Sequence, residues 1–459
     1  MTLLRDMCYP TPQELALAAR ALADAHPSLV RLRRTGTSRG GRPLWLLSVQ
    51  SPAEGGTRPA TAPGSGTDAG SGPDAGSGSG PGVAARRNVL VVAGAHANEP
   101  VGGPTALALA RRVLDAPGLR AGCGWHFLLC ADPDGAALHR TPHPHSILDY
   151  HRNFFRPPGP EQPEWAPSLL PPDRLPPETL ALTALIDELR PVLQVSLHAT
   201  DLGGSWVQLT RDIPGLAEPF AKSAAELRIP VETGASDAAG WPSPGPGIFV
   251  MPAPDSDAPG VFHPEDTRLS TWYHAHAYDG TTAIVEVPMW ASDLVDDPAP
   301  HPDPRRALRS LARRLTADAD QVARVLAGAR GQLPAGDPVS GPLLRAVDWT
   351  LALIPQIAAE WSAGSAPPEA TAAYIGSIDA FARRLALRAA AMLLRVLCAA
   401  GHPAATALER LVTGWCEAFA ARFQPRWVPV ATQVEHQTRT VLATYERLLA
   451  AGPPATAGG

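Results

Sequence analysis

Cysteine is scarce in this sequence, and its spacing forms no pairing motif. Five cysteines occur among 459 residues, and no C-x-x-C pair is present. An odd number of cysteines without such a pair argues against a disulfide framework and a cysteine zinc site, and it fits a reducing compartment. The first residues, MTLLRDMCYP, also lack the apolar segment of a secretion signal. We therefore expect a cytoplasmic protein.

Long apolar runs and a basic excess are missing as well. No stretch of about 18 apolar residues occurs, so we expect no membrane span. The chain has 39 Lys and Arg against 44 Asp and Glu, which gives a formal net charge of −5. This balance gives no reason to expect a nucleic acid or an anionic membrane surface as a partner. Hydrophobic residues make up 45% of the chain, which is enough for a sizeable core.

Strand-like and helix-like segments alternate through residues 1–300. Strands are expected at 29–35, 43–50, 88–95, 125–131, 192–198, 205–210 and 281–287, and helices at 11–26, 104–114 and 178–190. Apolar strands separated by helices are typical of a mostly parallel sheet that helices cover on both faces. Residues 1–300 are therefore predicted to form an α/β domain.

Two segments within this domain have the composition of loops. Residues 51–83 are rich in Gly, Ser and Ala and contain GSGTDA followed directly by GSGPDA. Such a tract cannot bury a core, so we expect a disordered surface insertion there. Residues 156–177 are rich in proline and are predicted to be a second loop.

The pattern becomes helical from about residue 303 onward. Apolar residues recur with a period of about 3.6 residues, as in the set Leu308, Leu311 and Leu315. This periodicity predicts an all-α C-terminal domain of about five helices over residues 303–452, whose apolar stripes most simply form a core. Residues 453–459, PPATAGG, are expected to be a disordered tail.

The segment GAHANEP, residues 94–100, carries the sharpest local motif. His96 and Glu99 lie three residues apart directly after an apolar strand. In a loop that leaves a strand, this spacing lets an imidazole and a carboxylate face one cation. The pair by itself is weak, because H-x-x-E occurs by chance, and a solvated histidine beside a helix-starting glutamate is the simpler interpretation.

Two further candidates, His198 and Glu286, lie in apolar strands. His198 ends the segment VLQVSLH, and open α/β sheets place ligand sites at the carboxyl ends of strands. With His96 and Glu99 it completes a set of three zinc ligands that leaves a fourth position for water. Glu286 interrupts TTAIVEV and suits a general base. A hydrogen-bonded structural histidine and a solvated edge-strand glutamate are the simpler alternatives.

Six segments resemble, in the same order, the M14 family of zinc carboxypeptidases over roughly residues 8–295. They are the opening YPTPQELALAARALADAHPSLVRLRRTGTSRGGRPLWLLSV, then GAHANEPVGG, DPDGAALHR, HRNFFRP, VSLHAT and AIVEVP. The order of six segments is far more specific than any one of them. The resemblance implies a mixed, mostly parallel central sheet flanked by helices, followed here by the all-α C-terminal region.

The resemblance also implies a metal centre. His96, Glu99 and His198 match the ligands of one zinc ion per chain. Glu286 matches the base that activates zinc-bound water and passes the proton to the leaving amine.

The family's two arginines have matches of their own. Arg152, in HRNFF, matches the arginine that grips the terminal carboxylate of the substrate, a role that its planar fork suits. Arg140 is the best match to the arginine that stabilises the oxyanion. His151 stands where the family usually has asparagine, so it is a candidate substrate-binding residue. At this position the substrate specificity could differ from that of the family.

The function implied is hydrolysis of the C-terminal amide bond of a peptide or peptide-like substrate with a free C-terminal carboxylate. Two alternatives stay open. One is a zinc amidase or deacylase of small N-acyl amino acids. The other is a non-catalytic binding or scaffold protein that acts through its helical C-terminal domain, whose partner the sequence does not identify.

Overall fold

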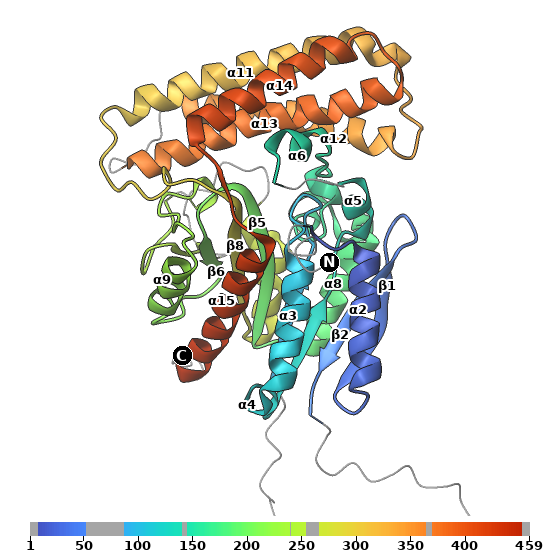
Figure 1. Cartoon of the computed structure of the whole chain (residues 1–459), viewed down its shortest axis with the longest axis vertical. Helices are drawn as coiled ribbons and strands as arrows, with labels where there is room; N and C mark the ends of the chain where they lie inside the picture. Colours follow the sequence, from blue (N-terminus) through green and yellow to red (C-terminus); the bar gives the residue numbers. More distant parts are fainter. Residues whose placement is uncertain are drawn as a thin grey trace, which may run out of the picture.

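A computed structural model describes residues 8–51, 87–139, 145–238, 240–253, 266–363 and 370–451. Its centre is a mixed sheet (Figure 1). Along the sheet the strands are β1 (Val30–Thr37), β2 (Pro43–Val49), β4 (Cys123–Leu128), β3 (Arg87–Ala93), β5 (Leu193–Gly203), β8 (Thr281–Ala291), β6 (Trp206–Leu209) and β7 (Ile248–Val250), with the short β9 (Arg426–Trp427) paired to β8. The four central strands β4, β3, β5 and β8 run parallel, whereas β1, β2 and β6 each run antiparallel to a neighbour. The predicted mixed α/β sheet is confirmed.

The central strands are apolar on both faces because helices cover both. Val89 and Val91 of β3 pack with α2 (Pro12–Ala25), α3 (Gly102–Asp115) and α15 (Val430–Ala451). The intervening Leu90 and Val92 pack with α8 (Pro177–Leu189) on the other face. Successive side chains of a strand alternate between faces, so one apolar run supplies both cores.

The first helix of the described chain begins with hydrogen bonds between Thr11 and Glu14. In α2 the Thr11 hydroxyl accepts from the Glu14 amide, and the Glu14 carboxylate accepts from the Thr11 amide, which is the expected capping box. Residues 52–83 of the expected Gly/Ser-rich insertion lie outside the described residues, as does the 453–459 tail. The proline-rich segment 156–177 has short helical turns and otherwise runs as a loop.

The remaining short elements lie in the connections between the strands and long helices. They are α4 (Pro117–Arg120), α5 (Pro133–Leu138), α6 (Ile147–Arg152), η1 (Gly159–Glu161), α7 (Ala166–Leu169), η2 (Pro172–Arg174), α9 (Ala217–Glu226), η3 (Ser236–Ala238), η4 (Thr267–Leu269), α10 (Thr271–His274), η5 (Ala275–Tyr278) and η6 (Arg330–Gln332). Within the described ranges, no helix combines the length and apolarity needed to cross a bilayer.

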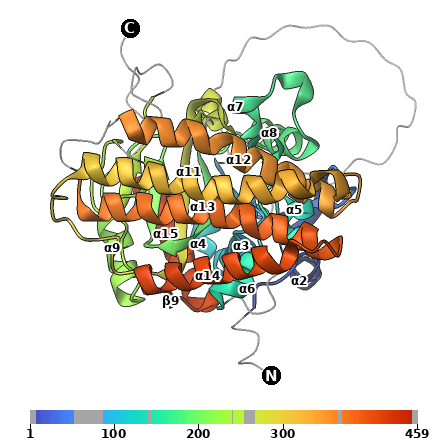
Figure 2. The same cartoon turned by 90° about the horizontal axis from the view of Figure 1, so that it is seen from above.

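Four long C-terminal helices form a layer across one end of the sheet (Figures 1 and 2). They are α11 (Pro304–Ala329), α12 (Ser340–Ala363), α13 (Ala372–Ala399) and α14 (Ala405–Phe423). Their core is continuous with Ala199 and Leu202 of β5 and with Val287 and Met289 of β8, so this helical layer covers the carboxyl ends of the central strands. The fifth helix, α15, leaves the layer and packs on the sheet beside α3 and α9. The predicted domain boundary near residue 303 stays a prediction.

Candidate metal centre

Four residues singled out in the sequence lie together at the carboxyl ends of β3, β5 and β8. His96 and Glu99 belong to the turn after β3, whereas His198 lies in β5 and Glu286 in β8. His198 and Glu286 are register partners in parallel strands, so their side chains leave the same face of the sheet. Gly94 has a φ of 62°, a left-handed conformation that lets the chain turn after β3. Each of the four candidates is at most 9% exposed.

Both imidazoles direct a nitrogen at one carboxylate. Nδ1 of His96 lies 3.0 Å from Oε1 of Glu99, and Nδ1 of His198 lies 2.9 Å from Oε2 of Glu99. Two ligands at about 2.0–2.1 Å from a tetrahedral zinc ion stand about 3.3–3.4 Å apart. The observed separations are slightly shorter, so small side-chain shifts would admit the ion. Oε1 of Glu286 lies 3.9 Å from Nδ1 of His198, beside the same point.

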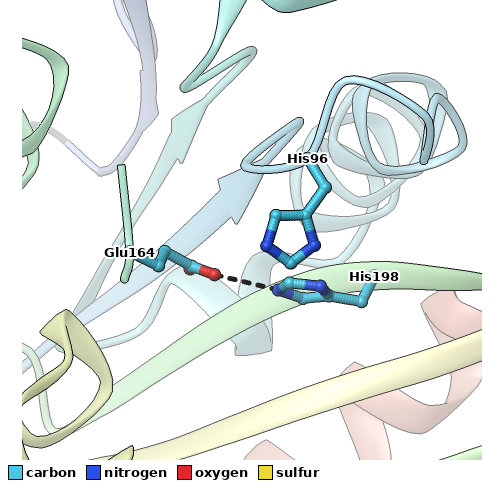
Figure 3. A group of neighbouring side chains, drawn as sticks. All are labelled: His96, Glu164 and His198. Carbon is cyan, nitrogen blue, oxygen red and sulfur yellow. Dashed lines mark hydrogen bonds and ion pairs between the residues drawn. The ribbon is translucent and has the colours of Figure 1, made fainter. Parts of the chain in front are cut away.

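A carboxylate that the sequence did not single out, Glu164, lies on the other side of His198 (Figure 3). Nε2 of His198 donates to Oε2 of Glu164 at 3.0 Å, and the Ser196 hydroxyl donates to Oε1 at 2.6 Å. Ligand atoms of His96, Glu164 and His198 also lie within 4.8 Å of one another. Two buried carboxylates therefore flank the histidine pair. Glu164 belongs to the proline-rich segment 156–177, where no motif or strand pattern marks it.

The two histidines have opposite pKa shifts. Burial, reinforced by Arg156, lowers the pKa of His96 to about 4, so this imidazole is neutral at pH 7. Burial alone would also lower the pKa of His198, but the carboxylates of Glu164 and Glu99 raise it well above its usual value. His198 is thus stabilised as a cation between two carboxylates, and a metal ion on Nδ1 would take the place of one proton.

Glu99 and Glu286 also have pKa values pushed apart. Burial alone would raise the pKa of Glu99, but the adjacent imidazoles hold it well below its usual range. Burial and the negative charge of Glu99 raise the pKa of Glu286 well above its usual value. Glu99 therefore stays ionised beside a Glu286 carboxyl group that holds its proton. Such a pair, a fixed anion next to a group that can transfer a proton, is typical of acid–base sites.

Arg156 also reaches this centre, although the sequence did not single it out. Its guanidinium donates to Oε1 of Glu99 at 2.9 Å, to Nε2 of His96 at 3.1 Å and to Oε1 of Gln162 at 3.2 Å. Donation to Nε2 places the His96 proton on Nδ1. A metal ion on Nδ1 would move this proton to Nε2, so Arg156 would turn away from His96. Arg140, predicted for the oxyanion, lies outside the described residues.

The structure places the predicted substrate-binding pair away from this centre. Arg152 ends α6 and forms an ion pair with Glu409 of α14, and 41% of its side chain is exposed. His151 is buried, its Nδ1 donates to the Ile147 carbonyl at 2.8 Å, and its ring stacks on Phe154. Neither Arg152 nor His151 is among the described residues that line the cavity at the metal centre.

This cavity has a volume of about 340 Å³ and joins the metal centre to the helical layer. His96, Glu99, His198 and Glu286 contribute to its lining. Helices α12 and α13 contribute Trp349, Leu353, Phe381, Arg384, Arg388 and Met392. The C-terminal helices therefore build part of the wall of the candidate substrate site.

Residues 17–203 match the zinc carboxypeptidase family, peptidase M14. These residues are less than half of the chain, and over them the chain is similar to the zinc carboxypeptidase family. The matched segment includes His96, Glu99 and His198, and it ends before Glu286 and the C-terminal helices. The predicted resemblance to the zinc carboxypeptidases is confirmed over this segment, whereas the roles of individual residues stay predictions.

Solved structures with some likeness include a metallo-carboxypeptidase from Burkholderia cenocepacia and the carboxypeptidase A from Helicoverpa armigera. The first is 16% identical, covers 61% of this chain and 60% of its own, and has a TM-score of 0.37. The second is 16% identical, covers 62% of this chain and 66% of its own, and has a TM-score of 0.36. The chain thus spans less than two thirds of either carboxypeptidase, and this likeness carries no information on substrate. No curated protein matches the chain at a significant level.

Proposed function

We propose that this protein is a zinc-dependent metallocarboxypeptidase that hydrolyses the C-terminal amide bond of a peptide or peptide-like substrate. The observation that carries the proposal is the convergence of His96, Glu99 and His198 on one point, with Glu286 beside it. Three protein ligands with an open fourth position are characteristic of catalytic zinc sites. The proposed stoichiometry is one zinc ion per chain.

The two imidazoles would hold zinc through Nδ1, and Glu99 through its carboxylate. A zinc ion held there supplies a Lewis acid that polarises the scissile carbonyl and makes water acidic at neutral pH. Glu164 accepts the Nε2 proton of His198, which orients the ring and leaves the Nδ1 lone pair for the metal. Gln437 of α15 supports the same strand, since its amide donates to the His198 carbonyl at 2.7 Å.

Glu286 is proposed as the general base. It takes a proton from the attacking water and returns it to the nitrogen of the leaving amine. A carboxyl group serves this double role best when its pKa lies closer to neutrality than usual. Burial and the charge of Glu99 shift the pKa of Glu286 in that direction.

Arg156 is proposed to take the role that the sequence suggested for Arg140. Its guanidinium already lies beside Glu99 and His96, where the carbonyl oxygen of a bound substrate would gain negative charge. A positioned cation is most effective where charge develops during the reaction. If Arg156 turned away from His96, its guanidinium donors would be free to bond to that oxygen. The hydrogen bond from Arg156 to Gln162 would keep the side chain in place.

The decisive variant is Glu286→Gln. It should retain zinc and melting temperature, while kcat falls at least about 100-fold because proton transfer is lost. Glu218→Gln is a matched control, since this carboxylate lies on α9 with 87% of its side chain exposed. Zinc analysis and mass spectrometry of peptide products give the two readouts. Wild-type activity in Glu286→Gln would remove the proposed mechanism.

The cavity wall supports a second candidate, a zinc deacylase of small N-acyl amino acids. Residues of α12 and α13 limit the cavity to about 340 Å³, a size at the lower end for small-molecule sites. Hydrolysis of N-acyl amino acids without trimming of longer peptides would favour the deacylase. A purified protein that binds less than about half an equivalent of zinc, even after zinc addition, would instead favour the scaffold alternative.

A further inference from the structure

Two arginines of α13 reach the cavity from the helical layer. Arg384 and Arg388 lie four residues apart, so they share one face of the helix. Both line the cavity that contains the metal-centre residues. Arg384 bonds to the Asp201 carboxylate through Nη1, and Nη2 of Arg388 donates to the other Asp201 oxygen at 2.8 Å. The Arg388 guanidinium also lies 4.9 Å from the ring centroid of Phe154.

The charges of Arg384, Arg388 and Asp201 do not balance. Two guanidinium groups share the single carboxylate of Asp201, which is 3% exposed. The cavity-lining carboxyl of Glu232 is only about half ionised at pH 7, because burial raises its pKa to about 7. The nearby His151 is neutral, because burial lowers its pKa to about 4. The two arginines, Asp201 and Glu232 therefore keep a net positive charge of about one half at pH 7 in a buried setting, where an unpaired charge is costly.

The hydrogen-bond donors are also in excess. Each guanidinium carries five N–H donors. The Nε atoms of Arg384 and Arg388 are buried and have no hydrogen-bond partner among the described residues. Buried donors without partners are rare in folded proteins, and an anionic ligand in the cavity is one way to satisfy them.

This group lies close to the metal centre. Nη1 of Arg384 is 3.1 Å from the Thr200 hydroxyl, and Thr200 follows His198 by two residues in β5. Residues two apart in a strand face the same side, with about 7 Å between their Cα atoms. A substrate about two residues long could therefore place an acyl carbonyl near His198 and a carboxylate near the arginines.

We propose that Arg384 and Arg388 form the receptor for the free carboxylate of the substrate. This inference rests on the proposed function, and it assigns to Arg384 and Arg388 the role that the sequence suggested for Arg152, which forms an ion pair with Glu409 of α14 instead. The substrate class is an acylated amino acid or short peptide with a free carboxylate. Because α13 lies beyond the matched residues 17–203, the C-terminal helices would set specificity.

The test measures binding without turnover, because every protein in it carries Glu286→Gln, which blocks hydrolysis of the N-acetyl ligand. N-acetyl-phenylalanine and its uncharged amide are titrated against the full chain, and binding is followed by tryptophan fluorescence, since Trp272 and Trp349 line the cavity. The chain with this substitution alone should prefer the acid. Arg388→Gln should reduce the ratio of acid to amide affinity at least about tenfold, because charge-assisted hydrogen bonds to the carboxylate are lost. Arg152→Ala is the control and should leave the ratio within about twofold of that chain.

Asp201→Asn provides an independent variant with the opposite expected effect. Removal of the internal carboxylate frees both arginines, so acid affinity should rise while amide affinity stays constant. An unchanged ratio in folded Arg388→Gln, or a lost preference in Arg152→Ala, would overturn the receptor. If the acid preference depends on Arg388 but the protein with Glu286 intact has no hydrolytic activity, the receptor is upheld and the proposed function is rejected.

Discussion

Replacing Glu164 by glutamine should weaken zinc binding without removing a ligand. The Glu164 side chain is fully buried and accepts from Nε2 of His198 at 3.0 Å and from the Ser196 hydroxyl at 2.6 Å. Glutamine has the same shape, and its amide oxygen can still accept from His198, so the fold should persist. What is lost is the negative charge that makes His198 a stronger donor to a metal ion.

The expected magnitude follows from this geometry. Loss of a partner that orients a metal-binding histidine weakens metal binding about 10- to 100-fold, which corresponds to about 1.4–2.7 kcal/mol. A second effect opposes it at low pH. Of the neighbouring groups, Glu164 raises the pKa of His198 most. Its removal therefore lowers this pKa, so protons compete less with zinc for Nδ1 of His198. The loss of zinc affinity should therefore grow as the pH rises from about 6.5 to about 8.5.

Competition with a chromophoric chelator at several pH values measures these affinities. Glu178→Gln is the matched control, because Glu178 is a carboxylate of α8 that is 1% exposed and bonds to Arg39 rather than to a histidine. It should leave zinc affinity unchanged. Wild-type affinity of Glu164→Gln at every pH would refute the reasoning. A loss as large as that of Glu99→Gln would make Glu164 a direct ligand.

Three further predictions concern stability. Burial raises the pKa of Glu232 from its ordinary value of 4.5 to about 7. The folded state therefore keeps a proton that the unfolded state releases near pH 4.5, and the free energy of unfolding falls as the pH rises from about 4.5 to about 7. The free energy of unfolding of Glu232→Gln, measured with urea, should therefore match that of the wild type near pH 4.5 and exceed it by about 3 kcal/mol at pH 8. Free zinc at about 100 times its Kd should raise the unfolding free energy of the wild type by about 2.7 kcal/mol, and that of His198→Ala by far less, in the same assay. Arg152→Ala should cost less than about 1 kcal/mol by thermal unfolding, because Arg152 and Glu409 are partly exposed, at 41% and 36% of their side chains, and a larger loss would contradict that interpretation.

The sequence singled out those parts of the candidate site that lie in apolar strands or directly after one. His198 and Glu286 stand out because a polar side chain in a buried strand needs a partner, and His96 and Glu99 follow directly after such a strand. The strands themselves were predictable from local apolar runs. Their pairing order was not, because a run does not reveal its neighbour in the sheet.

Residues outside such strands gave no comparable signal. Glu164 and Arg156 lie in the proline-rich segment 156–177, which has no periodic pattern. Arg384 and Arg388 follow the helical period of α13, which indicates a common face but not what that face contacts. The same limit applies to α15, whose apolar stripe suggested a bundle helix although it packs on the sheet. Arg152 matched a family motif, yet α6 directs it to Glu409 of α14, beyond the matched segment.

The position of the metal tests the central proposal most directly. A crystal of the zinc-loaded protein, measured at the zinc absorption edge, should show one anomalous peak per chain. We expect this peak at about 2.0–2.2 Å from Nδ1 of His96, Nδ1 of His198 and an oxygen of Glu99. A peak between Glu164 and Nε2 of His198, or no peak at saturating zinc, would contradict the proposed metal centre.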